Sequence, residues 1–254
     1  MSTSPVFLRP PPTSTHRRTD RLTPLTDASV TAHIWSMISM SESPHQGQPV
    51  RTAGAKLEAA TAAMVMIHGR GATAESILTL VPAIDTPGFA YLAPQAFGNT
   101  WYPNSFLSPI PSNEPGISSG LAAIEDLMER IQKAEIPPER TMLLGFSQGA
   151  CLSIEYAARH ARRYGGIAGL SGGLIGPDDT PRNYPGSFDG TPVFLGCSDI
   201  DSHIPAQRVR DTSAVFERMG AVVTMLLYAG MGHTVNDDEV ARVRTMMSAV
   251  VAGK

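Results

Sequence analysis

The chain has 254 residues, of which 42% are hydrophobic and 17% are charged, with a formal net charge of −3 at pH 7 and two cysteines. These values are typical of a globular protein large enough for one α/β domain, and two cysteines predict no disulfide framework, which favours a cytoplasmic location. The negative charge and the lack of a basic stripe argue against nucleic acid as a partner, and no apolar run approaches the about 20 residues that insert stably into a bilayer.

The first part of the chain is rich in proline, serine and threonine. Residues 1–27 hold too little apolar surface to offset the entropy of ordering them, and we predict a flexible N-terminal tail there. From residue 28 to 254 we expect a single domain. Its start, residues 28–57, is interpreted as an antiparallel edge hairpin, with a first strand around Val30 and Ile34.

Strand and helix patterns alternate over the remainder of the chain. Strands are predicted at 62–67, 88–92, 141–144, 166–170, 192–195 and 221–228. Helices are predicted near 75–81, at 117–131, 148–159 and 206–219, and after Asn236. The proline-rich segment 93–116 reads as a long loop, and such loops are usually functional. This alternation predicts an α/β fold with a mostly parallel, doubly wound sheet and helices on both faces.

One strand-to-helix junction carries the pattern G-x-S-x-G, with Gly145, Ser147 and Gly149. Glycines on either side of the serine let strand and helix approach closely, and the tight corner exposes the hydroxyl above the sheet. A short apolar run precedes the pattern and a helical pattern follows it. The stretch therefore predicts a nucleophile elbow with Ser147 as the nucleophile.

A serine nucleophile needs a base, and the base needs a carboxylate that orients it. Of the histidines after Ser147, His160 lies about 20 Å along the helix, and His203 would share one loop with its own acid. His233 follows the last predicted strand, where strand ends converge on a ligand crevice, and is favoured as the base. The acid should follow the strand ending near Leu195, and the residues alone leave Asp199 and Asp201 as alternatives.

The tetrahedral intermediate of acyl transfer needs two backbone amides as an oxyanion hole. The amide of Gln148 is one candidate, and the amide of Arg70 in the segment H-G-R-G is the other. The Arg70 side chain is expected at the solvent or against an acidic substrate group. For Trp101 and Tyr102 two interpretations stay open, as pocket lining or as anchors of their loop. We expect no metal and no cofactor.

Four motifs together resemble the phospholipase/carboxylesterase family of α/β-hydrolases, which includes the acyl-protein thioesterases. The family pattern reads H-G-x-G, G-F-S-Q-G, D-x-x-(V/I)-P and G-H, and this chain carries 68–71, 145–149, 201–205 and 232–233 in the same order. The resemblance implies Ser147 as nucleophile, His233 as base and Asp201 as acid. It also implies that the amides of Arg70 and Gln148 form the oxyanion hole.

The expected function is a metal-independent serine carboxylesterase that works through an acyl-enzyme. Its expected partner is a small-molecule ester with a short-to-medium acyl group, with thioesters and lysophospholipids as variants of the same chemistry. A homodimer is compatible with the resemblance. The alternative is a non-catalytic α/β-hydrolase-fold protein that binds a ligand in the same crevice.

Overall fold

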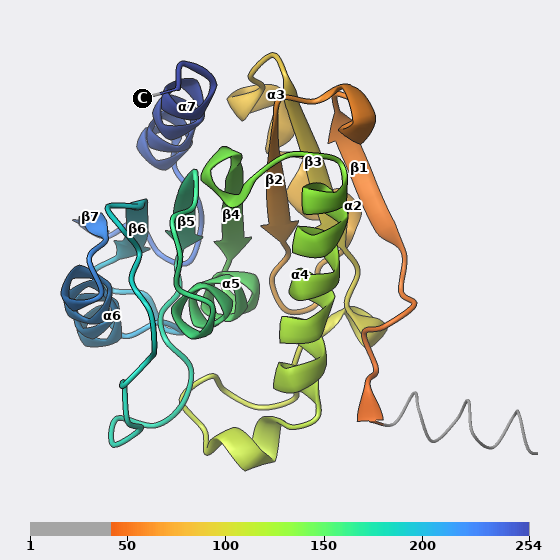
Figure 1. Ribbon diagram of the computed structural model, residues 1–254. Helices are drawn as coiled ribbons and strands as arrows, with labels where there is room; N and C mark the ends of the chain where they lie inside the picture. The colour runs from red at the N-terminus through yellow and green to blue at the C-terminus, as the bar shows by residue number, and fades with distance from the viewer. Residues whose placement is uncertain (1–41, 254) are drawn as a thin grey trace, which may run out of the picture. The chain divides into compact units, whose positions relative to one another are not determined.

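A seven-stranded sheet with helices on both faces is built by residues 42–253, which are the residues that the computed structural model describes (Figure 1). The strand order is β1-β3-β2-β4-β5-β6-β7. Strand β1 pairs antiparallel with β3, and the other neighbouring pairs are parallel. The predicted α/β class, with a mostly parallel sheet, is therefore confirmed.

The strands and helices alternate along the chain as the sequence patterns predict. The strands are β1 (Val50–Gly54), β2 (Ala62–Ile67), β3 (Phe89–Pro94), β4 (Thr141–Phe146), β5 (Gly166–Leu170), β6 (Pro192–Ser198) and β7 (Val222–Tyr228). The α-helices are α2 (Ala74–Leu78), α3 (Val81–Ile84), α4 (Gly116–Lys133), α5 (Gln148–Arg159), α6 (Ala206–Arg218) and α7 (Asp237–Val251).

The structure differs from the prediction at a few boundaries. The single helix expected near 75–81 is two short helices, α2 and α3, and Pro82 stands in the first turn of α3, where its missing N–H costs nothing. Strands β4 and β6 extend to Phe146 and Ser198, two and three residues beyond the predicted ends. The expected tail, residues 1–27, and the strand near Val30 lie outside the described residues, so the domain boundary stays a prediction.

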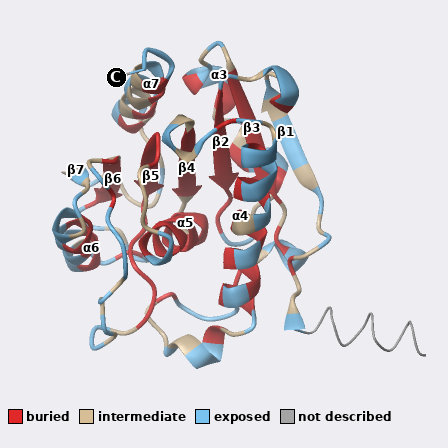
Figure 2. Cartoon of the chain, in the orientation of Figure 1, coloured by how far each residue is buried: buried red, intermediate tan, exposed pale blue. Residues whose placement is uncertain are grey.

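Two apolar layers enclose the sheet (Figure 2). On one face, helices α4, α5 and α6 pack on side chains such as Val65 and Leu143. On the other face, α2, α3 and α7 cover side chains such as Met64 and Leu144. Strands β2 and β3 are buried along their whole length, as expected for parallel strands covered on both sides.

The parallel strands end at the same edge of the sheet, where ligands bind in folds of this class. The loops after β2, β3, β4, β6 and β7 therefore meet at this edge, and they carry the residues singled out in the sequence. None of the helices between residues 42 and 253 combines the length and the apolarity that a membrane span requires.

Candidate active site

Ser147 stands at the sharp corner between β4 and α5. Its φ of 55° and ψ of −120° are strained for a residue with a side chain. The corner fits only because two glycines flank it: a Cβ on Gly149 would lie 2.2 Å from the Ile67 carbonyl oxygen, and one on Gly145 would lie 2.3 Å from the Gly149 oxygen. The strain is held by this close packing and by the Ser147 amide, which donates to Leu170 O at 2.9 Å.

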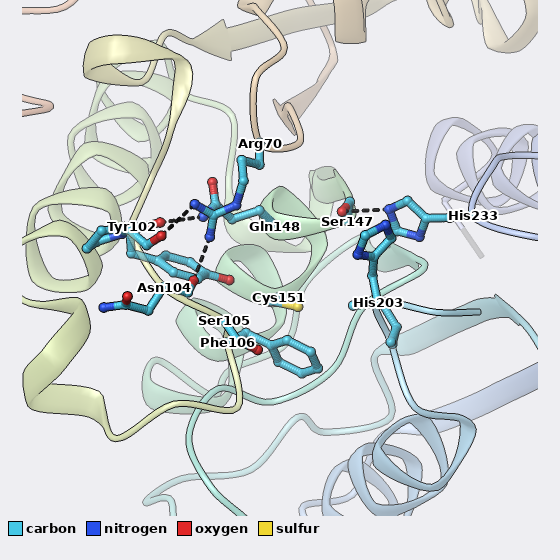
Figure 3. Close-up of a pocket in the computed structure, with 12 residues that line it drawn as sticks. Arg70, Tyr102, Asn104, Ser105, Phe106, Ser147, Gln148, Cys151, His203 and His233 are labelled. Atoms are coloured by element: carbon cyan, nitrogen blue, oxygen red, sulfur yellow. Dashed lines mark hydrogen bonds between the residues drawn. The ribbon is translucent and has the colours of Figure 1, made fainter. Parts of the chain in front are cut away.

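A continuous hydrogen-bonded chain runs from this serine to an acid. His233 Nε2 lies 2.8 Å from Ser147 Oγ (Figure 3). On the other side of the ring, His233 Nδ1 lies 2.7 Å from Asp201 Oδ2. The Asp201 side chain is fully buried. Burial alone would raise the pKa of its carboxyl, but hydrogen bonds from His233 and from the amides of His203 and Ile204 lower that pKa below its usual range. Asp201 is therefore a carboxylate at neutral pH and holds the Nδ1–H tautomer of His233.

The other acid that the sequence left open, Asp199, has a different contact. Its Oδ1 accepts the amide of Gly230 at 2.8 Å, and Ser198 Oγ accepts the amide of Gly232 at 3.1 Å. Both bonds tie the loop after β6 to the loop that carries His233. His160, at the end of α5, is paired with Glu125 at 3.6 Å and does not line the cavity above Ser147.

The loop after β2 brings the second predicted amide to the serine. A Cβ on Gly69 would lie 3.4 Å from Ser147 Cβ, so this loop packs against the elbow. His68 is buried, with Nδ1 2.8 Å from Gly69 O and Nε2 accepting the Ala96 amide at 3.1 Å. Burial lowers the pKa of His68, so the ring is neutral and fixes the loop. Within residues 42–253, the amides of Arg70 and Gln148 have no hydrogen-bond acceptor and are free to bind an oxyanion.

A cavity of about 410 Å³ opens above Ser147. Tyr102 and Phe106, from the loop after β3, form one wall, and Cys151 from α5 lies beside them (Figure 3). Trp101 is outside this lining: its buried indole donates to His68 O at 2.9 Å and anchors the loop. Burial raises the pKa of the Cys151 thiol to about 12, so this thiol stays protonated.

The side chains of Gln148 and Arg70, whose amides are the proposed oxyanion donors, also hydrogen-bond to the backbone of the loop after β3 and hold it in place. The sequence did not reveal this second role. Gln148 Oε1 accepts the Trp101 amide at 2.9 Å, and its Nε2 donates to Tyr102 O at 2.8 Å. The Arg70 guanidinium donates to Pro103 O at 2.8 Å and to Asn104 O at 2.5 Å. The Arg70 side chain, which was expected at the solvent or against an acidic substrate group, therefore also binds the loop after β3. The one sequence feature that could have indicated such a role is that Gln148, a polar residue, stands at the start of a buried helix.

Between residues 42 and 253, no three histidine, cysteine, aspartate or glutamate side chains gather as metal ligands. The expectation of metal-independent chemistry stays a prediction.

Comparison with known proteins gives a consistent set of relatives. The phospholipase/carboxylesterase family matches residues 52–251. Acyl-protein thioesterase 1 of Candida albicans is 29% identical over 131 residues, which are 50% of this chain and 57% of that protein, so the chain spans little more than half the length of such curated relatives. The crystal structure of a phospholipase/carboxylesterase from Dyadobacter fermentans is 40% identical, with a TM-score of 0.77 over 80% of this chain and 97% of that one. A carboxylesterase from Bacillus cereus, 14% identical, shares the fold with a TM-score of 0.62 over 84% of this chain and 98% of its own.

Proposed function

The chain belongs to the phospholipase/carboxylesterase family of α/β-hydrolases, and from this premise we propose that it is a serine carboxylesterase with Ser147 as nucleophile, His233 as base and Asp201 as acid. The observation that carries the proposal is the chain of two hydrogen bonds, 2.8 Å and 2.7 Å, that links these side chains at the mouth of a cavity. The amides of Arg70 and Gln148 form the proposed oxyanion hole.

In the proposed reaction, His233 Nε2 takes the proton of Ser147 as Oγ attacks the acyl carbonyl carbon. The carbonyl electron pair moves to the oxygen, which the two amides stabilise in the tetrahedral intermediate. The intermediate collapses, the C–O bond to the alcohol breaks, and His233 gives its proton to the leaving alkoxide. Water then attacks the acyl-enzyme with His233 again as base, and the acid and the free serine are released.

The substrates that fit the cavity are small esters with short-to-medium acyl groups. A volume of about 410 Å³ is near the lower end of the range for small-molecule pockets. The relatives named acyl-protein thioesterase 1 extend the proposal to thioesters, since a thiolate leaving group uses the same acyl-enzyme. Lysophospholipids are a further variant of the same chemistry. A cytoplasmic location and a homodimer stay predictions from the sequence.

The test combines turnover with covalent labelling. We expect the protein to hydrolyse p-nitrophenyl esters, with a rate that falls from short to long acyl chains, and to react with a fluorophosphonate at one site. Ser147→Ala should lose the labelling and lower kcat by about 10⁵-fold or more, because no other lining group replaces the nucleophile. Lack of both turnover and labelling in the folded wild type would contradict the proposal and favour a ligand-binding protein without catalysis.

A further inference from the structure

Among the described residues that line the cavity, Arg70 is the one with a permanent charge. Arg70, His203 and His233 are its ionisable cationic or basic lining residues, and no aspartate or glutamate is among the lining residues in the described part of the chain. We propose that the cavity selects esters that carry a carboxylate on their acyl or alcohol part, with Arg70 and His203 as the groups that bind it. This inference rests on the esterase function proposed above and specifies its substrate class.

Arg70 supplies a fixed charge that pairs with no carboxylate of residues 42–253. Its guanidinium donates to two carbonyl oxygens, Pro103 O and Asn104 O, and lies 5.9 Å from the centre of the Tyr102 ring. These partners are uncharged, and within residues 42–253 Arg70 forms no ion pair. A guanidinium has five N–H donors, of which two are used here. The remaining donors sit on a group whose orientation the loop has already fixed, which favours binding of an anion.

His203 stands on the other side of the serine. Its ring is exposed and lies 4.7 Å from the His233 ring, centroid to centroid, in a T-shaped arrangement. Its main-chain amide donates to Asp201 at 2.8 Å, while its ring has no hydrogen-bond partner among the described residues. In Figure 3, Arg70 and His203 lie on opposite sides of Ser147, and the Arg70 guanidinium is turned toward Tyr102 and Asn104. Because both residues line the cavity, a substrate that extends from the serine toward either side meets one of these two side chains.

Asp201 and Asp178 are acidic groups that lie outside the lining of the cavity. The Asp201 side chain is fully buried behind His233 and is saturated by His233 and two amides. Behind the wall of the cavity, the buried Arg208 guanidinium lies 5.8 Å from the centre of the Phe106 ring. Its carboxylate partner, Asp178, is 97% exposed and therefore lies toward the solvent. The described lining of the cavity thus carries the charge of Arg70 and no carboxylate, and this favours an anion over a neutral group of the same size.

The test compares esters that differ only in charge. One pair is the p-nitrophenyl ester of adipic acid, with its free carboxylate, against the same ester of adipic monoamide. The second pair, 4-acetoxybenzoate against 4-acetoxybenzamide, places the charge on the leaving group, and each rate is corrected for uncatalysed hydrolysis. We expect kcat/KM to be about tenfold higher for the anionic member of at least one pair at low salt. This ratio should fall toward one as NaCl is raised to 1 M, because salt screens the attraction.

Two variants locate the effect. His203→Gln keeps a polar group of similar size but removes the imidazole, and it should lower the anionic-to-neutral ratio about threefold. Lys133→Gln removes a positive charge at the far end of α4, outside the cavity, and should leave the ratio unchanged. Equal or slower cleavage of both anionic esters, with neutral esters still cleaved, would overturn the inference and leave the esterase function standing. Failure to cleave any ester, together with no fluorophosphonate labelling, would instead overturn the proposed function itself.

Discussion

Ser147 leaves β4 at the middle of the sheet, whereas His233 follows β7 at its edge. The strand before Ser147 is buried from Thr141 to Gly145, and the strand before His233 is half exposed. Around the serine, an added Cβ on Gly149 meets backbone at 2.2 Å, but one on Gly232 in the histidine loop meets nothing within 4 Å. Close packing therefore fixes the nucleophile, and hydrogen bonds fix the base. The two halves of one site should respond differently to the same kind of substitution.

The largest effect is expected for Asp201→Asn, which changes the hydrogen bond between Asp201 and His233. An asparagine favours the wrong tautomer of His233 and no longer balances its charge, so we expect kcat/KM for a p-nitrophenyl ester to fall about 10⁴-fold with the fold retained. Asp199→Asn is the matched control, because the Asp199 side chain accepts the Gly230 amide, whereas His233 is bound to Asp201. We expect a loss of less than about tenfold for it. Equal losses for the two variants would refute the distinction between these acids.

Gly149→Ala disturbs the close packing around the Ser147 corner. The new methyl group would overlap the carbonyl oxygens of Ile67 and His68, at 2.2 and 2.5 Å, and backbone atoms cannot move aside easily. We expect the free energy of unfolding to fall by about 3 kcal/mol, measured by urea denaturation followed by circular dichroism. Ala150→Gly, one residue on in the same helix, gives a comparison without overlap and should cost about 1 kcal/mol.

Gln148→Leu tests whether hydrogen bonds also contribute on the packed side. The change leaves the Trp101 amide and the Tyr102 carbonyl without their partners in a buried setting, and we expect about 2 kcal/mol of lost transition-state stabilisation, or about 30-fold in kcat/KM. Gln95→Leu, which removes bonds to Ala74 and Asn99 from the same loop region, is the control. If both variants lose activity equally, the hydrogen bonds of the Gln148 side chain do not act on the serine in particular.

The pH dependence of stability tests the helix that follows the histidine loop. Glu239 caps α7 together with Asn236, and burial raises its pKa from 4.5 to about 7. Because the folded state binds this proton more tightly, the contribution of Glu239 to the free energy of unfolding is fully present below pH 4.5 and is lost as the pH rises through about 7. Glu239→Gln should remove this loss and be about 1–2 kcal/mol more stable than wild type at pH 8. Glu129→Gln, at an exposed acid on α4, should leave the change between pH 5 and 8 as in wild type; the same flattening in this variant would exclude Glu239 as the cause.

Gly232→Ala should have the smallest effect. Its φ of +78° is unfavourable for alanine, but the space around it is open. We expect a loss of about 1 kcal/mol in the free energy of unfolding and a kcat/KM within about fivefold of wild type. A collapse of stability like that expected for Gly149→Ala would show that packing fixes both sides.

The sequence predicts those parts of the molecule that depend on local patterns. The elbow at Ser147 and the helix start at Asn236, with its capping box, each follow from residues that are near one another in the chain. The hydrogen bonds of the Gln148 and Arg70 side chains could not be predicted, because each joins a side chain to carbonyls or amides of a distant loop whose path is irregular. The choice between Asp199 and Asp201 depended on the family resemblance, since both follow β6 and differ only in which group of the next loop they reach.

The interactions that build the site join distant points of the chain. Ser147 and His233 are 86 residues apart, Trp101 and Gln148 are 47 apart, and Asp201 and His233 are 32 apart. Contacts of such long range close large loops, and they form slowly compared with helices. During refolding from denaturant, helical signal should therefore return before esterase activity does. The catalytic rate would then report on completion of folding, because Ser147, Asp201 and His233 meet only after β4, β6 and β7 have been assembled in the sheet.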